Sequence, residues 1–537
     1  MLIALALFPI AAALLLMGKF KVSPGKALTG AWLATAAIAA LVWKMPLVNI
    51  AAASLLGLGK ALDIILIIFG AIFLLNILKH VGAFTTINRS FSSISDDRRI
   101  QLIIIAWLFA GFIEGTSGFG AAPALAAPLL AGLGFPAITA VAVSLICNSL
   151  SVPFGAAGLP TMTIASTLSS SFANSGTDPE SFSREMLNIM TLSSGFSGLF
   201  IPLCAIAFMI FSSKKDRKLR SLLEITPLAI LSAAVYIIPW RYTALYLGME
   251  LPSIMGALIG LPIIICCIKF RFLVPKYVWD FPKNEKSSFK DTTLSDTPEI
   301  PAYQAWMPYI LLALLLLLLR LPFLPFKEML NCGTLHLPEI FKVPGTNFSW
   351  NILNNPGIVP FALLSISSAF LWKIRPQEQI KILNSTLKQI WMASVAVAAS
   401  IAMVQIMVFS RSNGADMPGM LSCIALGAAE FMGKAYIIGA PFIGIFGTFF
   451  AGSCTVSNIL FVQLHFDTAQ MLKLNEALLI ALQDAGAGLG SMIRISGVIA
   501  ACATVNLKNK ETEIILKNCI PALFLALMIL LGAYIFF

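Results

Sequence analysis

Residues 114–128 read EGTSGFGAAPALAAP and lie between two of the most apolar stretches of the chain. LIIIAWLFAGFI (102–113) precedes them and GFPAITAVAVSLIC (134–147) follows. The stretch places one carboxylate, three glycines and two prolines where a continuous apolar helix would otherwise form. It can be a loop, a tight packing site or the working centre of the protein, and the rest of the sequence bears on that choice.

The composition is that of a membrane protein. Of 537 residues, 58% are hydrophobic and 11% are charged, with a mean hydropathy of +0.89. Soluble domains contain roughly 45–50% apolar and about 25% charged residues. Apolar runs recur from Leu2 to Phe537, and a spanning helix needs about 20 such residues. We therefore predict an all-α polytopic membrane protein with about 12–14 transmembrane helices, the first apolar run being a retained helix rather than a signal peptide.

The net charge of +11 is concentrated in short segments beside the apolar runs, so topology explains it better than nucleic-acid binding. The most basic short loop is SSKKDRKLRS (212–221), which the positive-inside rule places in the cytoplasm. One alternation then puts the N-terminus outside. It also places four charge-poor or balanced segments outside: 44–60, 153–188, 241–250 and 320–357.

This alternation requires an irregularity in each half. If Arg99 is inside and 153–188 outside, the stretch 114–135 must add a crossing or a re-entrant hairpin. The same difficulty arises between Arg411 and Lys508, around GSCTVSN (452–458). Irregular backbone at membrane depth occurs only inside protein or along a watery cavity. We therefore predict two broken or re-entrant segments.

Matched interruptions in two halves are typical of inverted-repeat secondary transporters, whose binding site lies at the interruptions. The predicted organisation is an N-terminal transmembrane half, a cytoplasmic linker and a C-terminal transmembrane half, at 1–268, 269–305 and 306–537.

In the first half, Glu114 is the leading candidate, because an ionisable group within a spanning region is costly and usually functional. It can carry a coupling proton, or it can cap the broken helix or pair with a base. A break here would expose backbone N–H groups that favour an anion, although small residues also form packing seams. The other candidates for substrate binding are Gly115, Thr116, Ser117, Gly118, Gly120 and Asn148.

In the second half, the polar residues of 451–461 are candidates for lining the substrate site: Ser453, Thr455, Ser457 and Asn458. Further along, Asp484 and Arg494 lie ten residues apart in an apolar, glycine-rich stretch. They can approach each other across a break, or Arg494 can hold a substrate carboxylate with its planar fork. Asp484 joins Glu114 as a candidate for proton coupling.

Enzyme motifs are missing from the sequence. GAAEFMGKA (427–435) is one residue too long for a phosphate-binding loop and has Ala435 in place of the Ser or Thr that would bind magnesium. The three histidines and nine cysteines form no metal-ligand spacing. We expect no catalysis, no cofactor and no metal site.

Four local patterns resemble the L-lactate permease family of bacterial lactate and glycolate proton symporters. They are FIEGTSGFG (112–120), NSLSVPFGAAGLP (148–160), PFIGIFGTFFAGSCTVSNILF (441–461) and AGAGLGSMI (485–493), in the family's order and spacing. Cys454 stands where the family has Asp or Asn. Ser491 stands where it has Lys, and Arg494, one turn on, could restore that charge.

The resemblance implies proton-coupled symport of a small monocarboxylate such as L-lactate or glycolate across the bacterial inner membrane. The partners would be a small organic anion, a proton and membrane lipid, without nucleic acid. A sodium-coupled or exchange-type carrier of another organic anion is the nearest alternative. An anion channel or a membrane-embedded enzyme would be a different class.

Overall fold

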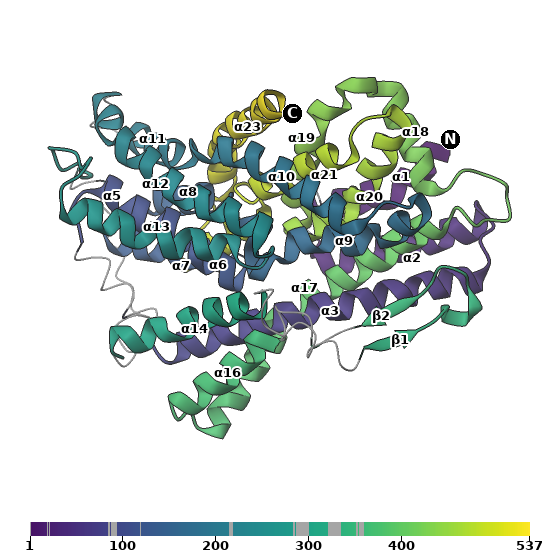
Figure 1. Cartoon of the computed structure of the whole chain (residues 1–537), viewed down its shortest axis with the longest axis horizontal. Coiled ribbons are helices and arrows are strands. Elements are labelled where there is room, and N and C mark those ends of the chain that lie inside the picture. Colours follow the sequence, from purple (N-terminus) through teal and green to yellow (C-terminus); the bar gives the residue numbers. More distant parts are fainter. Residues whose placement is uncertain are drawn as a thin grey trace.

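A computed structural model describes residues 2–18, 20, 22–83, 86, 94–118, 120–213, 219–282, 285, 300–320, 334–350, 353 and 359–537. Within this part the chain is almost entirely helical (Figure 1). In chain order, the helices of the first half are α1 (Leu2–Gly18), α2 (Pro24–Leu41), α3 (Leu47–His80), α5 (Arg98–Leu102), η1 (Ile103–Phe109), α6 (Ala110–Ser117), α7 (Ala121–Gly132), α8 (Ala137–Asn148), η2 (Val152–Phe154), α9 (Gly155–Ser175), α10 (Pro179–Gly198), α11 (Ile201–Ser212), α12 (Leu219–Tyr246) and α13 (Pro252–Lys269).

The remaining elements include one short hairpin, in which β1 and β2 pair antiparallel. They are α14 (Ala302–Arg320), β1 (Leu335–Leu337), η3 (Ile340–Lys342), β2 (Phe348–Trp350), α16 (Val359–Leu371), α17 (Pro376–Phe409), α18 (Met420–Met432), η4 (Gly433–Ala435), α19 (Tyr436–Ala451), α20 (Cys454–Leu472), α21 (Glu476–Gly490), α22 (Ile495–Thr504) and α23 (Glu511–Phe536).

Nine helical segments of the described residues are long and apolar enough to cross a membrane, and the bent pair formed by α8 and α9 raises this to ten. The count is below the 12–14 spans predicted, because α1, α7 and α16 are short and α20 is rich in polar residues. The all-α polytopic class is confirmed.

Two segments predicted as external loops are helical instead. Residues 47–60 form the first part of α3, and most of 153–188 forms α9 and the start of α10. Hydropathy missed α9 because it is rich in Ser and Thr, several of whose hydroxyls form hydrogen bonds inside the protein. Thr167, for example, donates to the Thr163 carbonyl at 2.7 Å, and Ser171 donates to Gln463 at 2.9 Å.

The predicted orientation, with the N-terminus outside, relied on 44–60 and 153–188 being external loops, so it stays a prediction. Half of the basic segment 212–221, which fixed that orientation, lies outside the described residues (214–218), as does part of 269–305. The two predicted irregularities rest instead on backbone geometry, described below.

Helices from both predicted halves interlock. α3 packs lengthwise against α17, α2 also packs on α17, and α9 packs on α20. Figure 1 shows α14 and α16 together below the main body, beside α3. The site described next therefore lies among helices from both ends of the sequence.

The span that leads into the 114–128 stretch is wholly buried, and its central turns, η1, are π-helical. Trp107 on η1 donates its indole N–H to the Ser232 carbonyl of α12 at 3.2 Å, and its ring packs against Tyr236. π-Helical turns inside α-helices occur frequently at functional sites. Here they precede the helix that carries Glu114.

Candidate functional site

The predicted break in the first half is confirmed. α6 ends at Ser117 and α7 begins at Ala121, and between them Gly118 and Gly120 have φ of 62° and 85°. Residues other than glycine rarely adopt these positive φ values. The two glycines therefore allow the chain to stop one helix and start another within the packed interior.

The predicted break in the second half is confirmed as well. α19 ends at Ala451, Gly452 adopts the left-handed conformation, and Ser453 caps α20 with its hydroxyl accepting from the Val456 N–H at 3.5 Å. Ser is a preferred residue at this position, since it satisfies an amide that the helix leaves unpaired.

Two further breaks follow in the same order. α8 and α9 are bent by 69° across residues 149–151 and the short η2 helix, and α21 and α22 are separated by residues 491–494. Each half thus contains a pair of helices meeting at a break, then a second such pair. The internal repeat itself stays a prediction.

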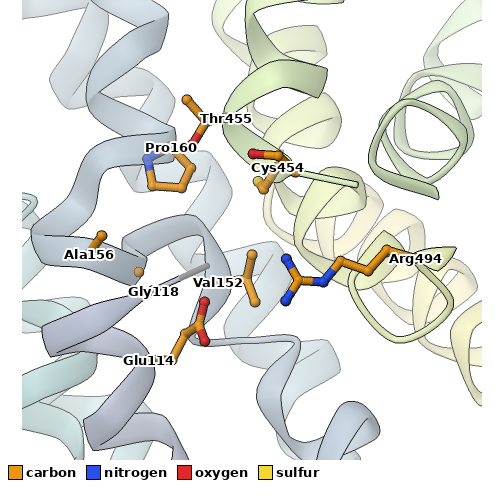
Figure 2. Close-up of a pocket in the computed structure, with 10 residues that line it drawn as sticks. Glu114, Gly118, Val152, Ala156, Pro160, Cys454, Thr455 and Arg494 are labelled. Atoms are coloured by element: carbon orange, nitrogen blue, oxygen red, sulfur yellow. The ribbon is translucent and has the colours of Figure 1, made fainter. Parts of the chain in front are cut away.

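All four breaks line one small cavity (Figure 2). Its volume of about 20 Å³ holds one or two water molecules. The figure shows first-half and second-half residues facing each other across it. The lining consists of Glu114, Gly118, Val152, Gly155, Ala156, Pro160, Ser453, Cys454, Thr455 and Arg494.

Glu114 places its carboxyl in this cavity although its side chain is almost wholly buried. One oxygen, Oε2, accepts a hydrogen bond from the Asn148 amide at 3.1 Å. The other, Oε1, lies beside Gly155, where an added Cβ would come within 2.9 Å. Oε1 is thus the oxygen that lies next to a cavity-lining residue.

Asp484 lies behind the cavity and is fully buried. Its oxygens accept from Asn458 at 2.7 Å and from Thr161 at 2.8 Å, with the Cys454 thiol at 3.9 Å. These donors are all neutral. Of the two arrangements left open by the sequence, direct pairing of Asp484 with Arg494 is therefore not the one adopted.

Arg494 is the cation of the site. It precedes α22 and its side chain is buried, with 4% of the residue exposed. Its hydrogen bond from Nη1 to the Gly452 carbonyl is long, at 3.5 Å. Its Nε–H has no partner among the described residues. Glu114 is within electrostatic reach, but the two side chains form no ion pair in the described part of the chain. Figure 2 shows the guanidinium pointing towards Glu114, with Val152 between them in this view.

A larger cavity of about 330 Å³ lies on another side of Arg494. Ser453 and Arg494 line both cavities, so the guanidinium forms part of the wall between them. The larger cavity extends to Lys79, at the end of α3, and to Gln389 on α17. It is the only one of the two with room for an organic acid.

Three helix N-termini surround Arg494 at the inner end of the larger cavity. Gly120 and Ala121 begin α7, Ser453 caps α20, and Ser496 lies in the first turn of α22. Helix N-termini present free N–H groups and a partial positive charge. Beside them lies a buried arginine that forms no ion pair with any described residue, which makes this end of the cavity suited to a carboxylate.

The other predicted site residues lie elsewhere. Asn148 and Asn458 hold the two carboxyls rather than line the small cavity. Gly115 packs on α13, and Thr116 and Ser117 lie on α6 with the Thr116 hydroxyl directed to carbonyls of its own helix. The Ser457 hydroxyl donates to the Gly444 carbonyl at 3.1 Å.

Several lining residues were not predicted from the sequence. In the small cavity they are Val152, Gly155, Ala156, Pro160 and Cys454. The first four belong to the stretch 148–160, of which only Asn148 was predicted as a site residue. Ala156 and Ala157 have positive φ there, and this cannot be read from alanine in a sequence.

A glycine substitution tests the geometry around Arg494. A Cβ at Gly120 would collide with Arg494 Nη2, and φ there already disfavours alanine. We expect Gly120→Ala to lower substrate affinity by about tenfold to a hundredfold, because a small displacement of a binding group is costly. Gly132→Ala, on the same helix with open space around it, should leave the affinity measured by radioligand binding unchanged. Equal affinities for the two variants would contradict the geometry.

A polytopic helical chain whose broken helices meet around a buried arginine and a buried carboxyl is built as a membrane transporter. The L-lactate permease family model matches residues 2–537, and the chain belongs to that family. It is an integral, multi-pass membrane protein, and the bacterial origin of its relatives fits the bacterial inner membrane.

The relatives cover nearly the whole chain. The L-lactate permease of Escherichia coli is 28% identical over 89% of this chain and 85% of its own length. A Haemophilus influenzae relative bearing the L-lactate permease name is 29% identical over 98% of this chain and 97% of its own length. The glycolate permease of Escherichia coli is 26% identical over 93% of this chain and 90% of its own length.

Proposed function

We propose that this protein is a proton-coupled symporter of small monocarboxylates such as L-lactate or glycolate. Family membership and the names of the relatives support the substrate class. The observation that carries the proposal is Arg494, a buried guanidinium with an unpartnered N–H among three helix N-termini. The substrate carboxylate supplies the missing counter-charge there.

Glu114 carries the coupling proton in this proposal. When Glu114 is ionised, Arg494 is held towards it across the small cavity. When Glu114 is protonated, the guanidinium is free to bind the substrate carboxylate at the larger cavity. Substrate and proton then favour the same state, which is the requirement for coupling. The mechanism needs only the two charges already facing one another.

Transport follows from movement at the breaks. The cavity lies between segments of the N-terminal half (1–268) and the C-terminal half (306–537), joined by 269–305. In the proposed cycle one set of broken helices moves against the other, so that the site opens to each side of the membrane in turn. The substrate carboxylate neutralises Arg494 and the proton neutralises Glu114. The loaded site then carries no net charge, which lowers the free-energy cost of moving it through the apolar interior.

Purified protein in liposomes containing a pH dye tests this function. External L-lactate or glycolate should acidify the lumen, at equal rates with and without sodium, after correction for protein-free liposomes. Substrate flux that requires sodium and leaves the lumenal pH unchanged would contradict proton symport. Flux that exchanges one anion for another without net uptake would assign the protein to the exchange class.

A further inference from the structure

We propose that the larger cavity binds the apolar tail of the substrate, so that the protein accepts monocarboxylates with longer or branched chains than lactate. The inference rests on the proposed function, since it takes Arg494 as the carboxylate site. It adds a substrate class, namely 2-hydroxy acids of four to six carbons with aliphatic side chains.

The first observation is size. The cavity beside Arg494 measures about 330 Å³, whereas the small cavity measures about 20 Å³. Cavities of about 300–1,000 Å³ hold organic ligands considerably larger than a three-carbon acid. A lactate bound at Arg494 would leave most of this volume to water, against walls that bind water poorly.

The second observation is the distribution of polar groups. Arg494 lines the cavity together with the hydroxyl-bearing Ser453 and Ser496, and the other polar lining residues are Lys79 and Gln389. The body of the cavity is aliphatic, formed by Ile68, Ile72 and Leu75 of α3, Ile390 and Val397 of α17, and Val456 of α20. A carboxylate at Arg494 with an aliphatic tail against this wall matches the arginine and the apolar residues of the cavity.

The third observation concerns the other occupants that an apolar cavity could hold. A hydrocarbon chain alone would leave the buried Arg494 without a counter-charge whenever Glu114 is protonated, which is unfavourable. Lys79, in the last turn of α3, also lines the cavity and adds a second positive charge that attracts anions to it. The occupant is therefore an acid whose carboxylate faces inward.

The test is competition for binding of radiolabelled L-lactate to the purified, full-length protein. The competitors are 2-hydroxy acids with the same head group and a side chain that grows from none in glycolate to branched C4 in 2-hydroxy-4-methylpentanoate. Each buried methylene should improve the inhibition constant by about fourfold. Inhibition that weakens with chain length, while lactate and glycolate still bind, overturns the inference and leaves the proposed function intact.

A cavity-filling variant locates the tail. Ala393 of α17 lines the larger cavity. We expect Ala393→Leu to weaken binding of the six-carbon acid by at least about tenfold and glycolate by less than about twofold. Ala398→Leu, on the same helix but outside the cavity lining, serves as the matched control.

The outcomes separate the two levels of the proposal. An equal loss of glycolate and of the six-carbon acid in Ala393→Leu, with Ala398→Leu unaffected, would place the tail elsewhere and overturn the inference. Failure of every acid, lactate included, to bind wild-type protein would overturn the proposed function together with it.

Discussion

Arg494→Gln should abolish measurable uptake, with substrate affinity lowered between ~30-fold and ~4,000-fold. Truncating one partner of a buried, hydrogen-bonded charge pair costs about 2–5 kcal/mol, and each 1.4 kcal/mol is a tenfold change in affinity. Arg494→Lys keeps the charge but loses the planar fork, so its affinity should lie between those of the wild type and Arg494→Gln. Equilibrium binding of radiolabelled L-lactate and liposome uptake measure both effects.

The same substitution distinguishes a binding role from a structural one. Because Arg494 makes only one long hydrogen bond in the described structure, Arg494→Gln should not lower the melting temperature of the ligand-free protein. A buried charge costs free energy unless it is paired, and Arg494 forms no ion pair with the described residues, so its removal breaks no close pair. Arg220→Gln, at an exposed arginine of α12, is the matched control for charge. A large fall in melting temperature with Arg494→Gln would show that Arg494 holds the fold.

Glu114→Gln should separate coupling from binding. Glutamine is nearly isosteric with a protonated glutamate and cannot ionise, so the variant would remain in the state in which Arg494 is free for substrate. We expect uphill, proton-driven uptake to be lost, while exchange of external labelled lactate for internal lactate persists. Both are measured in the same proteoliposomes, with and without an imposed pH gradient.

Asp484 provides the comparison for Glu114. It is as deeply buried, but its described partners are neutral and it lies outside both cavities. If Glu114→Gln retains uphill uptake and Asp484→Asn loses it while exchange persists, the coupling proton belongs to Asp484. If neither variant loses uphill uptake, the two carboxyls are structural.

The helix breaks could be predicted from the sequence because their signals are local. Glycines and polar residues inside apolar runs indicated 118–120 and 452–453, and the structure has both. α9 could not be predicted in the same way. Its Thr and Ser side chains make it resemble a surface loop, whereas Thr167 and Ser171 are satisfied by a carbonyl and by Gln463 within the packed interior.

The charges of the site could be predicted, but its walls could not. Glu114 and Arg494 are conspicuous in apolar surroundings, and the structure brings them to one cavity. The aliphatic wall comes from α3 and α17, where Ile72 or Val397 look like ordinary lipid-facing or core residues. Only the packing of α3 along α17 makes them line a cavity with Arg494.

The central claim is that Arg494 is shared between Glu114 and the substrate, and the most direct test is proton uptake on binding. Purified protein in weakly buffered detergent solution is titrated with L-lactate while pH and bound lactate are measured together. The account predicts that wild-type protein takes up a proton as lactate binds, and that Glu114→Gln binds lactate without proton uptake. Lactate binding to wild-type protein without proton uptake, or equal uptake by the variant, would contradict it.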